Sequence, residues 1–129
     1  MSLSIRHDDL VSQIATRADL RRFWIEAMQL PVKTADGSVF QFDRDSKELM
    51  EEAILGLTAS LGTANWRLED NTEITVNASQ LNAYCNELRL LRAQRAVQID
   101  AEYVAKKPLV DAGEVSLRDL EDWKFSHQV

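Results

Sequence analysis

The sequence predicts a mostly helical α+β fold with two short β-hairpins forming a small antiparallel sheet and one long helix. Apolar residues recur at helical spacing over most of the chain. Two pairs of short segments with alternating apolar residues flank turn-like stretches at 35–38 and 69–73. No glycine or proline interrupts the sequence between residues 77 and 107.

Length and composition are typical of one soluble domain, so the whole chain, 1–129, is expected to form a single domain. It has 129 residues, of which 45% are apolar and 28% charged. The single Cys85 excludes an intramolecular disulfide. No apolar run approaches the length of about 18 residues that a membrane span needs, so no membrane contact is expected.

Both termini are predicted to be helical. Residues 5–30 carry two apolar stripes, and Pro31 ends this region because it disfavours a helical conformation at the residue before it. Residues 108–129 form a C-terminal helical segment, in which Ser116 caps a short helix through Trp123. Its apolar side is predicted to project as a partner-docking anchor formed by Leu117, Leu120 and Trp123.

Two hairpins and a helix are predicted between these ends. The first hairpin pairs 32–34 with 39–42 through a tight Asp36-Gly37 turn, and the second pairs 66–68 with 74–76. Between them, a helix begins with Asp45 as its N-cap, supported by Glu48, and stops at Gly62.

The longest helix is expected from Asn77, with Gln80 in the capping-box position, to Lys107 before Pro108. Arg92 and Arg95 interrupt its apolar seam, which indicates a half-buried helix with a partner-facing end instead of a full coiled coil. The candidate partner-binding residues on this helix are Arg92, Arg95 and Tyr103. The seam itself consists of Leu81, Tyr84, Cys85, Leu88, Leu91, Ile99 and Tyr103.

No constellation of residues predicts a catalytic, cofactor or metal site. Asp43 and Asp45 could share a divalent cation, but a helix cap and a strand end explain them better. Cys85 could act as a nucleophile with His7 or His127 as base, yet its position on the apolar seam favours an inert, buried thiol. No glycine-rich phosphate loop is present. A small hydrolase therefore ranks as a weak alternative.

Nucleic-acid binding is not expected. The chain has 15 basic and 21 acidic residues, a formal net charge of −6, which opposes attraction to phosphate backbones. Two groups of arginines could form local basic patches, but solvated faces and ion pairs account for them. These groups are Arg17, Arg21 and Arg22, and Arg89, Arg92 and Arg95.

The order of motifs resembles a known phage domain. Phe40-Gln41-Phe42-Asp43 precedes Asp45-Ser46 and a helix, and Trp66-Arg67 with Asp70-Asn71 precedes Ile74-Thr75-Val76. The long helix that follows holds Arg92-Ala93 and Arg95-Ala96. From about residue 32 to 107, this order is similar to a domain of unknown function in tailed bacteriophages and prophages, which often accompanies tail-fibre and tail-fibre-assembly proteins.

The resemblance implies a non-enzymatic bacteriophage tail structural protein that joins fibre, tail or baseplate proteins through protein–protein contacts. It also implies a location in the virion tail. The alternative within the same biology is a tail-fibre assembly chaperone that acts in the host cytoplasm and leaves before the virion matures. The apolar seam of the long helix, together with the symmetry of fibres, leads us to expect self-association as a homo-trimer.

Overall fold

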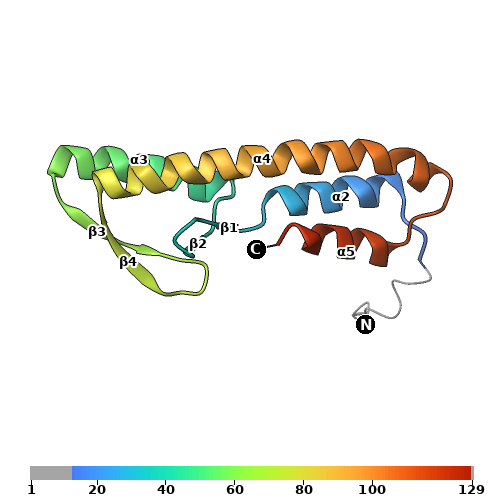
Figure 1. Cartoon of the computed structure of the whole chain (residues 1–129), viewed down its shortest axis with the longest axis horizontal. Helices are drawn as coiled ribbons and strands as arrows, with labels where there is room; N and C mark the ends of the chain where they lie inside the picture. The colour runs from blue at the N-terminus through green and yellow to red at the C-terminus, as the bar shows by residue number, and fades with distance from the viewer. Residues whose placement is uncertain (1–12, 129) are drawn as a thin grey trace, which may run out of the picture. The chain divides into compact units, whose positions relative to one another are not determined.

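The computed structural model describes residues 13–128 and confirms the mostly helical α+β class. Its helices and strands, labelled in Figure 1, are α2 (Arg17–Met28), β1 (Val32–Lys33), β2 (Val39–Phe40), α3 (Arg44–Ser60), β3 (Thr63–Arg67), β4 (Glu73–Asn77), α4 (Ala78–Asp111) and α5 (Leu117–Ser126). Among these residues, the two hairpins form separate two-stranded antiparallel sheets, a point that the sequence left open.

The chain divides into two compact units, a subdivision that the sequence did not predict. We call residues 13–28 with 96–128 the helical unit and residues 29–95 the hairpin unit. Helix α4 is continuous and contributes residues 78–95 to the hairpin unit and 96–111 to the helical unit. Each unit has its own hydrophobic core.

The helical unit packs α2 and α5 against the C-terminal half of α4, as Figure 1 shows. Its core lies among apolar residues of all three helices, including Leu20, Phe23, Ile99, Val110 and Leu120. The cap predicted at Ser116 is confirmed. It is a full capping box with Asp119, because each of the two side chains accepts the backbone N–H of the other residue. Helix α5 continues past Trp123 to Ser126.

The prediction that residues 5–30 are helical is wrong at residues 13–16, which precede α2. Residues 1–12 lie outside the described part, and Ile14 and Ala15 precede α2 in a non-helical conformation. Ile14 forms an antiparallel bridge with Ser116, and the Ala15 N–H donates to the Val115 carbonyl at 2.8 Å. These long-range bonds satisfy backbone groups that an extra helical turn would have used, and they bury Ala15.

Pro108 does not end α4, contrary to the prediction, because the helix runs on to Asp111. The stop comes from Gly113, which has a φ of 73°. Its N–H donates to the Val110 carbonyl, and the Glu114 N–H donates to the Leu109 carbonyl, both at 3.0 Å. This pair of bonds is a Schellman motif, and the extra turn buries Val110 in the core.

The hairpin unit buries the inner faces of α3, α4 and both hairpins in the second core. The members of this core are Val32, Phe40, Phe42, Met50, Leu57, Val76, Leu81, Cys85 and Leu88. In the β3–β4 hairpin, Trp66 pairs with Ile74 and Ala64 with Val76, so these four side chains share one face toward the core. The capping box predicted at Asn77 and Gln80 is present at the start of α4.

The two hairpin turns have the same construction, with three residues between the last paired positions. The Thr34 N–H donates to the Ser38 carbonyl, and the Leu68 N–H donates to the Thr72 carbonyl. The last loop residue has positive φ in both turns, Gly37 at 90° and Asn71 at 69°. Only Gly37 of the Asp36-Gly37 pair takes positive φ, so the predicted two-residue turn is replaced by a three-residue loop.

Helix α3 has its N-cap two residues before the predicted one and its C-cap one residue before the predicted stop. Asp43, and not Asp45, is the N-cap, and its carboxylate accepts the Ser46 N–H at 2.9 Å. At the other end, Leu61 takes the left-handed conformation with a φ of 57°, although Gly62 follows it. Leu61 is 91% exposed, so it gains little from burial while occupying a conformation that disfavours a side chain with a Cβ.

We therefore expect Leu61→Gly to raise the free energy of unfolding by about 0.5–1 kcal/mol, since it relieves the left-handed strain. Leu55→Gly is the matched control, because Leu55 is also exposed but lies inside α3. That control should lower the free energy by about 1 kcal/mol. Urea unfolding followed by circular dichroism measures both. A loss of stability in Leu61→Gly would contradict the strained cap.

Candidate functional site

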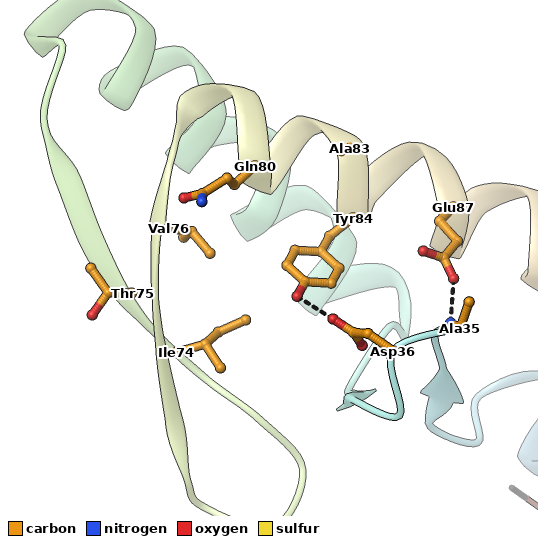
Figure 2. Close-up of a pocket in the computed structure, with 9 residues that line it drawn as sticks. All are labelled: Ala35, Asp36, Ile74, Thr75, Val76, Gln80, Ala83, Tyr84 and Glu87. Atoms are coloured by element: carbon orange, nitrogen blue, oxygen red, sulfur yellow. Dashed lines mark hydrogen bonds between the residues drawn. The ribbon is translucent and has the colours of Figure 1, made fainter.

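A cavity lined by both polar and apolar side chains lies in the hairpin unit and is drawn in Figure 2. Its volume is about 390 Å³. Its walls come from the first hairpin turn, from strand β4 and from the first turns of α4. The residues that line it are Ala35, Asp36, Ile74, Thr75, Val76, Gln80, Ala83, Tyr84 and Glu87.

Tyr84 and Asp36 form the central polar contact of this cavity. The Tyr84 hydroxyl donates to Oδ2 of Asp36 at 2.5 Å, which Figure 2 shows as a dashed line. Oδ1 of Asp36 accepts from the Thr34 hydroxyl at 2.6 Å and from the Ser38 N–H at 2.9 Å. The Tyr84 ring packs on Phe40, with 4.9 Å between ring centroids. The contact thus fixes the hairpin turn to α4.

These hydrogen bonds hold Asp36 in its charged form. The Thr34 hydroxyl, followed by the Tyr84 hydroxyl and the Ser38 N–H, lowers the pKa of Asp36 far below its usual range. The same carboxylate raises the pKa of Tyr84, because the neutral phenol is the hydrogen-bond donor. At neutral pH this pair keeps one negative charge beside the cavity.

Glu87 makes a second contact between α4 and the turn. One of its oxygens, Oε2, accepts the Ala35 N–H at 2.6 Å (Figure 2). Asp36 and Glu87 are the two carboxylates of the lining, which contains no lysine, arginine or histidine. The polar side of the cavity is therefore anionic, while Ile74, Val76 and Ala83 supply its apolar side.

The predicted docking residues of α5 do not project, which corrects that expectation. Leu117, Leu120 and Trp123 are buried in the core of the helical unit. The Trp123 indole N–H donates to Oε1 of Glu102 at 2.8 Å, so its polar end is also engaged within the chain. The capping box sets the phase of α5 and turns this apolar side inward.

The three docking candidates on α4 lie against the chain itself. Arg95 is half-buried and donates to the carbonyls of Leu30 and Pro31, at 2.7 and 3.0 Å. Burial lowers the pKa of its guanidinium. Arg92 is half-buried in the same unit, and Tyr103 packs on Trp24 with 5.5 Å between ring centroids.

The apolar seam that led us to expect a trimer faces inward. Leu81, Cys85 and Leu88 belong to the core of the hairpin unit, and Ile99 belongs to that of the helical unit. A different apolar stripe of α4 is exposed to solvent, and the seam pattern in the sequence does not indicate it. Val97 is 73% exposed and Val104 is 61% exposed, and they are seven residues apart.

The other residues considered for catalysis or metal binding do not form a site in the described part of the chain. Cys85 is buried, and this burial raises the pKa of its thiol, which opposes thiolate formation. His127 bonds to Glu102 at 2.9 Å, and His7 lies outside the described residues. Asp43 is used as the α3 cap. Among residues 13–128, no group of three or more histidine, cysteine or acidic side chains could hold a metal ion.

Two of the arginines that were considered as basic patches form ion pairs with the chain's own carboxylates, as the sequence led us to expect for Arg89 and its neighbours. Arg17 makes a bidentate contact with Asp111, at 2.7 and 2.6 Å. Arg89 lies 2.8 Å from Glu51. These ion pairs neutralise positive charges that a phosphate-binding surface would need.

Comparisons with known proteins do not identify a relative. No protein-family model, curated protein or solved structure matches this chain. None of the helices in the described part of the chain has the length and apolar character needed to cross a membrane. The resemblance to the phage domain therefore stays a prediction.

The Asp36 contacts predict a pH-dependent contribution to stability. Asp36→Asn should lower the free energy of unfolding by about 1 kcal/mol at pH 7, because charged hydrogen bonds are lost at an exposed site. The folded-state pKa of Asp36 is lowered, so its contribution is complete above the unfolded pKa of about 3.9 and declines as the pH falls below it.

Thermal unfolding of the wild type and Asp36→Asn from pH 7 to pH 2 measures this decline. Asp70→Asn is the matched control, since Asp70 accepts the Thr72 N–H and hydroxyl in the second turn but no bond from α4. The control should shift the melting temperature less. Equal shifts in the two variants would mean that the Tyr84 bond adds nothing.

Burial of the α5 side chains predicts a large stability loss on truncation. Leu120→Ala should cost about 2–5 kcal/mol, because it removes a fully buried side chain and leaves a cavity. Phe125→Ala, at a half-exposed position of the same helix, is the control. Denaturant unfolding compares the two. If Leu120→Ala were as stable as Phe125→Ala, Leu120 would not be a core residue, and the prediction of a projecting docking surface would stand.

Proposed function

We propose that this chain is a non-enzymatic bacteriophage tail protein that acts through protein–protein contacts, joining fibre, tail or baseplate proteins. One observation carries the contact role, an exposed apolar face on α4. We define this outer face by five uncharged, exposed residues of the helical unit: Val97, Ala101, Val104, Ala105 and Pro108. The assignment to a tail rests on the order of motifs between residues 32 and 107.

The outer face has the pattern of a helix-packing surface. At 3.6 residues per turn, positions 97, 101, 104 and 108 lie within one narrow stripe. Leu90 occupies the preceding heptad position of the same helix and is 59% exposed. Exposed β-branched residues in such a stripe add no stability to the isolated chain. Their burial against an apolar surface of another tail protein would stabilise the complex of the two proteins.

Quantitative mass spectrometry of purified particles tests the tail assignment directly. Particles from cultures that encode the chain should contain it at a fixed copy number relative to tail proteins. Absence from particles, with accumulation in cells bound to unassembled fibre protein, would replace the virion role with that of an assembly chaperone. Absence from both would contradict a tail function.

Substitution on the outer face tests the contact itself. Val97→Lys with Val104→Lys should lower the copy number in particles at least about tenfold, because two charges would be buried against the partner. Leu55→Lys is the matched control on α3, where the residue is 72% exposed. Wild-type incorporation of the double variant would place the contact elsewhere on the chain.

A further inference from the structure

We propose that the unpaired edge of β4 binds an extended, positively charged peptide segment as an added strand, with its side chains in the adjoining cavity. The site belongs to the hairpin unit alone. It is separate from the outer face of α4, and the inference does not depend on the tail assignment. Four properties of this region carry the inference, namely the strand edge, the position of the cavity, the apolar wall and the charge.

The hydrogen-bond register leaves backbone groups free along β4. The single bond from the Leu68 N–H to the Thr72 carbonyl makes this pair the first hydrogen-bonded pair of the hairpin. Hydrogen-bonded pairs alternate with non-hydrogen-bonded pairs along the ladder. Trp66–Ile74 and Ala64–Val76 are therefore hydrogen-bonded pairs. Thr75 and Asn65 form a non-hydrogen-bonded pair, so the backbone N–H and carbonyl of Thr75 point away from β3.

The cavity lies along this free edge. Its lining includes three consecutive residues of β4, Ile74 to Val76, and none from β3. Within residues 13–128 this sheet has two strands, so β4 has no second neighbour in the described part of the chain. In Figure 2 the space lies between β4 and the hairpin turn that carries Asp36. A strand placed at this edge would therefore run beside the cavity.

The apolar wall provides places for alternate side chains of an added strand. Ile74 and Val76 point to the same side of β4, toward Tyr84 (Figure 2), and Ala83 adds a small surface from α4. An added strand sends every second side chain to the same face, so its apolar residues would contact this wall.

The charge of the site selects a cationic segment. Asp36 and Glu87 face the cavity, and no basic residue lines it. Hydrogen bonds from Thr34 and Tyr84 keep Asp36 ionised, and Glu87 has one oxygen engaged with Ala35 and a second oxygen available. A lysine or arginine of the segment would complete this anionic side. The cavity along β3, by contrast, is lined by both Arg67 and Glu69, so its charges balance.

Fluorescence anisotropy with a labelled peptide tests the proposal on the full chain. The probe is fluorescein-Thr-Val-Thr-Lys-Thr-Val-Thr-amide, which places two valines and one lysine on the same face of an extended strand. Two peptides of equal length are controls, one with glutamate for lysine and one with alternate backbone amides methylated. The lysine peptide should bind, and each control should bind at least about tenfold more weakly, because charge or ladder hydrogen bonds are lost.

Variants of the protein locate the site. Thr75→Pro removes the outward N–H of β4 and should weaken binding at least about tenfold, while proline is tolerated on a strand edge. Asn65→Pro is the matched control, since it removes the outward N–H of β3 at the paired position. Both substitutions also remove the Thr75–Asn65 side-chain bond. Asn65→Pro should bind the peptide as the wild type does.

Glu87→Gln keeps an acceptor for the Ala35 N–H and removes the charge, so it should weaken binding about three- to tenfold. This variant keeps the test decisive if Thr75→Pro does not fold. No binding of the lysine peptide at millimolar concentration, or equal binding of the methylated peptide, would overturn the added strand. Equal binding of the glutamate peptide would overturn the charge selection.

Discussion

Burial of apolar side chains of helix α4 is the constraint on which each compact unit depends. Leu81, Cys85 and Leu88 enter the core of the hairpin unit, and Ile99 and Val110 enter that of the helical unit. A fully buried leucine or isoleucine contributes about 1.5–3 kcal/mol, so neither core retains its packing if α4 rotates about its axis. The same phase of the helix determines which residues remain outside, namely those of the outer face.

Local signals in the sequence predicted the elements well, while contacts between distant residues decided their ends and exposure. The capping boxes at Asn77 and Ser116 depend on side chains three residues apart, and both are present. The end of α4 was misplaced because burial of Val110 and the Gly113 motif outweigh the effect of Pro108. The direction of the α5 apolar side depends on a core formed with α2 and α4, which periodicity alone does not specify.

The candidate cavity shows the same division between local and long-range information. The turn sequence was enough to predict a hairpin around Asp36, and its bond to the Ser38 N–H is a local feature of such turns. Its bond to Tyr84 joins residues 48 positions apart, and the sequence assigned Tyr84 only to an apolar seam. The free edge of β4 follows from the register and from the absence of a third strand in this sheet among the described residues, and strand patterns in the sequence reveal neither.

The phase of α4 is the central claim, and solvent paramagnetic relaxation of methyl groups tests it most directly. A soluble gadolinium chelate is added to methyl-labelled protein, and relaxation is measured by NMR at low protein concentration. The structure predicts strong relaxation for Leu90, Val97 and Val104, which are exposed. It predicts weak relaxation for Leu81, Leu88 and Ile99, which are buried. Comparable relaxation of the two sets would contradict the assignment of inner and outer faces.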